Sequence, residues 1–148
     1  MIQEKLLAHF KDHIKQSLRT LEERKNEISL ALESENKSSA GDKHETGRAM
    51  IQLEREKLGE QIRKTEKNYE VLNQLKRYKG NGIIRSGSIV RTDNSNYYIA
   101  ASIPPVSFES NLFYYISAES PIGVLLLTKK VGDTFTINGK TSRIKEVI

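Results

Sequence analysis

The sequence contains no cysteine. That absence excludes a disulfide framework and a zinc site with thiolate ligands, and it permits a reducing compartment without proving one. Long apolar runs are also missing, because acidic and basic residues interrupt the opening MIQEKLLAHFKDHIKQ throughout. A signal peptide or a membrane span would need a continuous apolar run there. We therefore expect a soluble, cytoplasmic protein with no membrane partner.

Proline is scarce, and none of the three prolines precedes Pro104. The stretch 2–35 also lacks glycine, and its apolar residues recur every seven positions, at Leu7, Ile14, Leu21 and Ile28. A second proline-free stretch, 44–79, repeats one heptad position with a single interruption, at Ile51, Leu58, Thr65 and Leu72. Such patterns are typical of amphipathic helices that pack along a narrow seam.

The segment SSAG at 38–41 is the turn expected between these two stretches. So short a connection makes neighbouring helices antiparallel. We therefore predict that residues 1–79 form an antiparallel two-helix coiled coil with its tip at 38–46. Each helix would be on the order of 50 Å long, at about 1.5 Å per residue.

Glycine, serine, asparagine and short β-branched runs become frequent after Tyr78, so a second domain is predicted over 80–148. Strands are expected around 88–91, 96–101, 112–116, 134–137 and 142–147. Asn138-Gly139 supplies the turn of the last hairpin. Ser120-Pro121 resembles an N-cap followed by a first-turn proline, which predicts a short helix over 121–127. The fold class is therefore α+β, with a small bent sheet and one helix against it.

The composition favours an elongated or two-part chain, because 36% hydrophobic and 29% charged residues are lean for one compact globule of 148 residues. The 24 lysine and arginine residues outnumber the 19 acidic ones and give a net charge of +5. The sequence pI is about 9.4. A mildly basic chain of this kind suits contact with a polyanion without requiring it.

Two segments of this chain resemble the bacterial Gre transcript-cleavage factors. GDKHE, at the expected hairpin tip, is similar to that family's Gly-Asp-x-x-Glu motif. SPIGVLLLTKKVGDTFTI, near the end, is similar to its Ser-Pro-Ile-Gly segment and the Lys-Lys-Val-Gly-Asp that follows. The order of these segments, in a chain with a hairpin followed by a sheet, makes the combination fairly specific.

The resemblance implies a C-terminal domain similar to the FKBP fold and a partnership with RNA polymerase. In that family the C-terminal domain docks near the mouth of the secondary channel, here through Ser120, Pro121, Ile122 and Gly123. The coiled coil inserts into the channel, and the polymerase's own active site then cleaves backtracked RNA. The chain would thus be an accessory factor, not itself an enzyme, and a monomer. Contacts with the nascent RNA 3′ end or with polymerase would come from Lys43, His44, Arg48, Lys76, Arg77 and Lys79.

Asp42 and Glu45 are the tip acids to which the resemblance assigns the chemistry. Mg²⁺ prefers oxygen ligands and commonly takes only one or two carboxylates from a protein, so these two acids make an incomplete site that polymerase would have to complete. No Mg²⁺ is expected on the isolated protein. The pair also has the spacing of a capping box, with Asp42 as N-cap and Glu45 three residues later. These acids could therefore serve only to start the second helix.

Other interpretations stay open. Thr46 and Ala49 stand where the family usually has asparagine and an aromatic residue, which leaves room for a non-cleaving regulator of the secondary channel. The expected FKBP-like domain could belong to a prolyl isomerase with a chaperone arm, and the hairpin could serve oligomerisation.

His9 and His13 have zinc-compatible spacing, but HFKDH lacks the acid next to the first histidine that zinc hydrolases carry. The cations of QLKRYKGNGIIR either meet an anionic partner or favour the dipole at a helix end.

Overall fold

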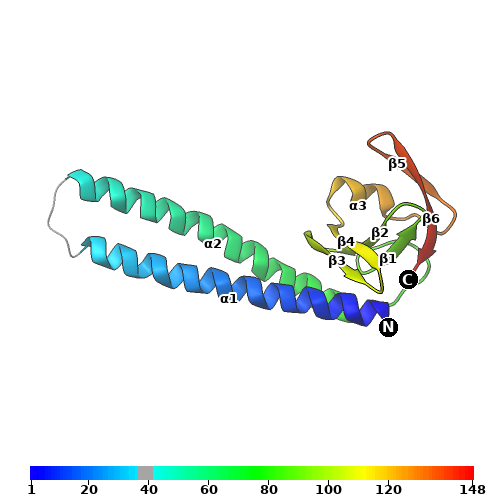
Figure 1. Ribbon diagram of the computed structural model, residues 1–148, viewed down its shortest axis with the longest axis horizontal. Helices are drawn as coiled ribbons and strands as arrows, with labels where there is room; N and C mark the ends of the chain where they lie inside the picture. Colours follow the sequence, from blue (N-terminus) through cyan, green and yellow to red (C-terminus); the bar gives the residue numbers. More distant parts are fainter. Residues whose placement is uncertain (37–41) are drawn as a thin grey trace. The chain divides into compact units, whose positions relative to one another are not determined.

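The computed structural model describes residues 1–36 and 42–148. Two long helices, α1 (Ile2–Asn36) and α2 (Asp42–Lys76), come first (Figure 1). They are followed by β1 (Ile89–Thr92), β2 (Asn96–Ala100), β3 (Ile103–Phe108), β4 (Asn111–Ser117), α3 (Pro121–Leu126), β5 (Thr134–Ile137) and β6 (Lys140–Val147). The predicted α+β class, with two long helices ahead of a sheet, is confirmed.

The chain divides into two compact units. Met1–Lys11 and Glu70–Ile148 form one, called here the sheet unit, and Asp12–Tyr69 forms the other, called here the helix-pair unit. The predicted division after residue 79 follows the change from helix to strand along the sequence. The compact units instead group the start of α1 and the end of α2 with the sheet. Leu6 and Phe10 of α1 and Leu72 and Leu75 of α2 are buried there.

The strands form one mixed sheet in the order β3-β4-β2-β1-β6-β5. The neighbours β2 and β4 are parallel, and the other neighbouring pairs are antiparallel. Five of these strands match the predicted ones to within two residues. The last hairpin turns at Asn138 and Gly139, with φ of 51° and 76°, as the sequence predicted.

The strand β3 was not predicted. Its sequence IPPVSF carries Pro104 and Pro105, and proline cannot donate a backbone hydrogen bond to a ladder. The strand forms because it lies at the edge of the sheet, beside β4 alone. Its pairing shifts register between Ile103 and Val106, so the two prolines fall where the ladder is irregular.

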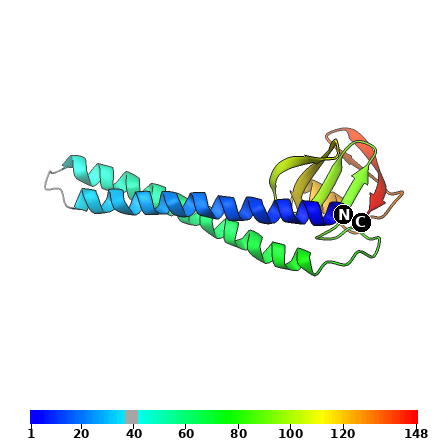
Figure 2. The same cartoon turned by 60° about the horizontal axis from the view of Figure 1, so that its bottom comes forward.

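Both faces of the sheet are covered. On one face Ile89, Tyr98, Phe113 and Tyr115 are buried. The Tyr115 hydroxyl donates to the Leu6 carbonyl of α1 at 2.6 Å, and the Phe10 and Tyr115 rings lie 6.0 Å apart. The opposite face packs with α3 in a cluster of Ile84, Val90, Ile99, Leu126, Phe135 and Ile144. Figure 2 shows the curved strands with α3 behind them. The period-2 alternation of strand side chains produces these two cores.

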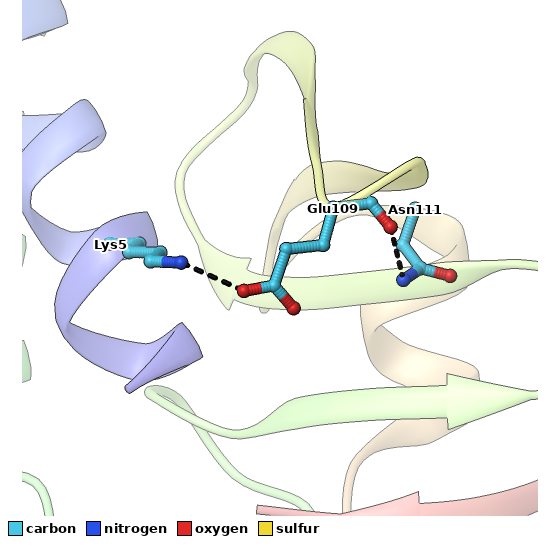
Figure 3. Close-up of polar contacts among 3 residues, drawn as sticks. All are labelled: Lys5, Glu109 and Asn111. Carbon is cyan, nitrogen blue, oxygen red and sulfur yellow. Dashed lines mark hydrogen bonds and ion pairs between the residues drawn. The ribbon is translucent and has the colours of Figure 1, made fainter.

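The β3–β4 turn contacts the first turns of α1. Glu109 and Ser110 both have positive φ, 52° and 66°, in a two-residue turn without glycine. The Lys5 ammonium lies 2.9 Å from the Glu109 carboxylate, and the Asn111 amide donates to the Glu109 carbonyl at 3.2 Å (Figure 3). This ion pair lowers the Glu109 pKa, chiefly through the hydrogen bond from Lys5. Since both side chains are exposed, the pair adds little stability.

In the helix-pair unit, α1 and α2 run beside each other in opposite directions (Figures 1 and 2). Arg24 of α1 lies 3.7 Å from Glu54 of α2. Side chains of both helices also line one hollow between them. The predicted antiparallel arrangement is thus confirmed for the described residues of this unit, whereas continuous coiled-coil packing stays a prediction. Ile28, Leu32 and Leu58 are buried, but the middle of the unit has a hollow between the helices. Six of its seven lining residues are of polar types: His13, Gln16, Ser17, Thr20, Leu21, Gln61 and Thr65.

Candidate functional site

The predicted tip is described only in part. Residues 38–41 lie outside the described residues, as do the side chains of Asp42, Lys43 and His44. The helix α2 begins at Asp42, so this acid stands at a helix start as the sequence predicted. Glu45 and Arg48 are exposed and, being three residues apart, share a face of the first turns of α2. A negative charge near a helix start is favourable, so Glu45 also has a structural reason to be there.

The Ser-Pro-Ile-Gly segment forms the start of α3 and is explained by local structure. The Ser120 hydroxyl accepts from the Gly123 amide at 3.1 Å and donates to the Ser117 carbonyl at 2.6 Å, so Ser120 is the N-cap. Pro121 opens the first turn, where no amide donor is required. A Cβ atom on Gly123 would lie 2.1 Å from the Ser117 carbonyl oxygen, so only glycine allows this close approach.

The exposed surface of this segment is small. Pro121 is exposed, Ile122 packs against the α3 core and Gly123 is buried. Val124, one residue further on, is 61% exposed. Of the four residues predicted to dock on a partner, Pro121 therefore offers the most contact surface, and Val124 extends that surface. Ser120 and Gly123 set the geometry of the helix start.

A basic hollow lies where α2 ends and the sheet unit continues. It has a volume of about 280 Å³ and is lined by Gln74, Arg77, Tyr78, Arg85 and Ser86. The Arg85 guanidinium carbon lies 5.2 Å from the centre of the Tyr78 ring. The structure thus brings the predicted contact residue Arg77 together with Arg85, eight positions later in the chain. Lys76 and Lys79 are exposed on the adjacent stretch.

Gln74 and Ser86 were not among the residues predicted for this region. Their only sequence signal is proximity to the basic stretch 76–85, because glutamine and serine are common on any surface. Tyr78 was expected either to pack under the sheet or to serve an interface. It is half-buried, and its hydroxyl lies 2.9 Å from the Ser88 hydroxyl and donates to the Ile148 carbonyl at 3.2 Å.

The two histidines of α1 do not point to a metal centre. His9 packs between aromatic rings, with its centroid 6.2 Å from Phe108 and 5.8 Å from Tyr115. His13 lines the hollow of the helix-pair unit. Within the described ranges, no group of three or more histidine, aspartate or glutamate side chains is arranged to hold a metal ion. The aromatic packing gives His9 a structural role in the sheet unit.

No protein-family model matches the chain, and no curated protein is similar enough to count as a match. Among the described helices, none is long and apolar enough to cross a membrane.

Proposed function

We propose that this protein is a Gre-like accessory factor of RNA polymerase that presents Asp42 and Glu45 to the polymerase active centre and stimulates cleavage of backtracked RNA. The observation that carries the proposal is the junction of the helices. α2 begins at Asp42, within GDKHE, only six positions after α1 ends at Asn36. Acidic residues at the junction of two long antiparallel helices suit a device that delivers carboxylates into a narrow channel.

The role of the tip acids follows from their chemistry. Exposed Glu45, with Asp42, would contribute carboxylate oxygens to a Mg²⁺ ion held jointly with polymerase. When bound there, that ion would polarise the scissile phosphate and activate water. The residues of this chain would only supply ligands to the ion, and hydrolysis would belong to the polymerase. Lys43, His44 and Arg48 carry or can carry positive charge next to these acids and would contact RNA phosphates.

The sheet unit is proposed to be an FKBP-like docking domain. Its support is the architecture of a bent mixed sheet with α3 against one face, together with the Ser-Pro-Ile-Gly start of α3. Docking would use Pro121 and Val124, which are exposed, on the helix start that Ser120 and Gly123 shape. An apolar contact of this size suits a transient partner, because weak complexes bury small interfaces.

The decisive experiment uses stalled, backtracked polymerase complexes with Mg²⁺ and follows release of short 3′ RNA fragments. The intact chain should accelerate release, and Asp42→Asn or Glu45→Gln should reduce the acceleration by roughly 10- to 100-fold, because each removes a metal ligand. Glu66→Gln is the matched control, since Glu66 is an exposed acid on the same helix with no ion pair among the described residues. Polymerase binding should be unchanged in all three variants.

Other results of these experiments would support a different function for the chain. Polymerase binding that changes initiation or elongation without fragment release would identify a non-cleaving regulator. Absence of polymerase binding would refute the proposal, and turnover of a proline-containing peptide would then support an isomerase. A protein mass that rises with concentration would contradict the expected monomer and favour the oligomerisation role of the helices.

A further inference from the structure

The basic hollow at the end of α2 has the features of a binding site of its own. It lies entirely within the sheet unit, and its lining contains two arginines, two neutral donors and no acid. In the described part of the chain, no carboxylate lies within ion-pair distance of Arg77 or Arg85. Lys76 and Lys79 add two exposed positive charges beside it. The result is a local excess of cations that attracts an anionic ligand.

Arg85 is held in a defined position. Its guanidinium lies over the Tyr78 ring, and its Nη2 atom donates to the Lys79 carbonyl. The ring is fixed in turn, because the Tyr78 hydroxyl is hydrogen-bonded to Ser88, which is buried. A guanidinium has five N–H donors, so most of them remain for a ligand after this one bond. Arg85 therefore loses little conformational freedom when it binds.

The donors in the hollow match those that proteins use for phosphate oxygens. Arginine forks bind phosphate with two parallel hydrogen bonds, and serine hydroxyls and glutamine amides commonly add neutral contacts to a nucleic-acid backbone. Gln74 and Ser86 supply these groups next to Arg77 and Arg85. An acidic peptide would usually need an apolar anchor as well, and the hollow offers none beyond Tyr78.

Tyr78 is not a platform for stacking bases. Arg85 covers part of the ring, and Gly87 approaches it so closely that a Cβ atom there would lie 2.5 Å from Tyr78 Cδ2. The ring is half-buried as a result. Without a free aromatic face or a groove for base edges, the site has no means of reading sequence.

We propose that the basic hollow binds the phosphate groups of a nucleic-acid backbone, independently of base sequence, through Arg77 and Arg85. Lys76 and Lys79, exposed and next to Arg77 and Tyr78 in the chain, strengthen the attraction. Binding at this site needs neither the tip acids nor polymerase, so this proposal can be tested independently of the proposed transcript-cleavage role.

The test is fluorescence anisotropy of the full chain with two short labelled single-stranded RNAs of unrelated sequence, across a range of salt concentrations. Arg77→Gln and Arg85→Gln should each raise the Kd roughly five-fold for both RNAs, and each should reduce the slope of log K against log salt by roughly 0.7, the value for one lost phosphate contact on a single strand. Lys140→Gln is the control, since it removes one exposed charge from the start of β6, in the same unit. Its Kd should stay close to that of the unchanged chain.

Additional variants and competitors keep the test decisive. Arg85→Lys retains the charge but loses the fork, so its Kd should lie between those of the unchanged chain and Arg85→Gln. Circular dichroism checks the fold, and if Arg85→Gln fails to fold, the exposed Arg77 carries the test alone. Single-stranded DNA should compete with RNA, because the ligand is the shared backbone. Equal Kd values for Arg77→Gln, Lys140→Gln and the unchanged chain, or displacement by poly-glutamate as effective as displacement by RNA, would overturn the proposal.

Discussion

The sheet unit and the helix-pair unit differ in how much apolar surface they bury. Large side chains that are fully buried lie almost entirely in the sheet unit, and in the helix-pair unit Ile14 is the one with this degree of burial among the described residues. Leu30, Met50 and Leu53 of the helix pair are exposed. Polar side chains line its central hollow. The comparison teaches that long helices with a heptad pattern do not by themselves guarantee a dense core, since most helix stability in proteins comes from packing.

The largest expected effect tests this difference in core density. Phe113→Ala, in the centre of the sheet unit, should lower the free energy of unfolding by about 3–5 kcal/mol, because it removes a fully buried ring and leaves a cavity. Leu58→Ala, in the helix pair, should cost about 2 kcal/mol, since a loosely packed site loses fewer contacts. Chemical denaturation measures both. A larger loss for Leu58→Ala than for Phe113→Ala would show that the helix pair has the tighter core.

A second test uses one glycine from each unit. Gly123→Ala should destabilise the sheet unit by about 2–3 kcal/mol, because the new methyl group would overlap the Ser117 carbonyl. Gly59→Ala should stabilise the helix pair by about 0.5–1 kcal/mol, since alanine is the better helix former and the nearest atom, Nη1 of Arg63, is 3.6 Å away. Thermal unfolding of the two variants should therefore shift in opposite directions. Shifts in the same direction would contradict this account of Gly59.

The smallest of the three effects is a dependence on alkaline pH. Burial raises the pKa of Tyr98 and of Tyr115, both in the sheet unit. A tyrosine with a raised folded pKa contributes its full stability below the unfolded pKa of about 10 and loses it as the pH rises toward the folded value. For each of these two tyrosines, we expect the free energy of unfolding of the sheet unit to fall by about 1 kcal/mol between pH 9 and pH 11. Denaturation followed at several pH values checks this, with Tyr98→Phe and Tyr115→Phe as variants that should weaken the dependence. An unchanged dependence in both would exclude these two phenols as its cause.

Much of the local structure was predictable because the signals are local. The two helices, the N-cap Ser120, the turn at Asn138-Gly139 and five strands follow from side-chain periodicity and turn chemistry. The strand β3 was missed since its two prolines argue against a central strand, and only its edge position removes the objection. The turn at Glu109 and Ser110 was equally hidden, because neither residue type signals a positive φ.

The candidate sites, too, have features that the sequence predicted and features that it did not. The sequence alone placed the acidic pair at the start of the second helix and the Ser-Pro start of the short one, because capping depends on residues within one turn. It also grouped the cations of QLKRYKGNGIIR, but it could not place Arg85 over Tyr78 or show that Arg77 has no acid beside it, since both depend on how the chain turns after α2. Periodicity and capping fix elements, whereas the grouping of charges in a basic hollow depends on how the elements pack. Only the tertiary structure decided that these cations line a hollow.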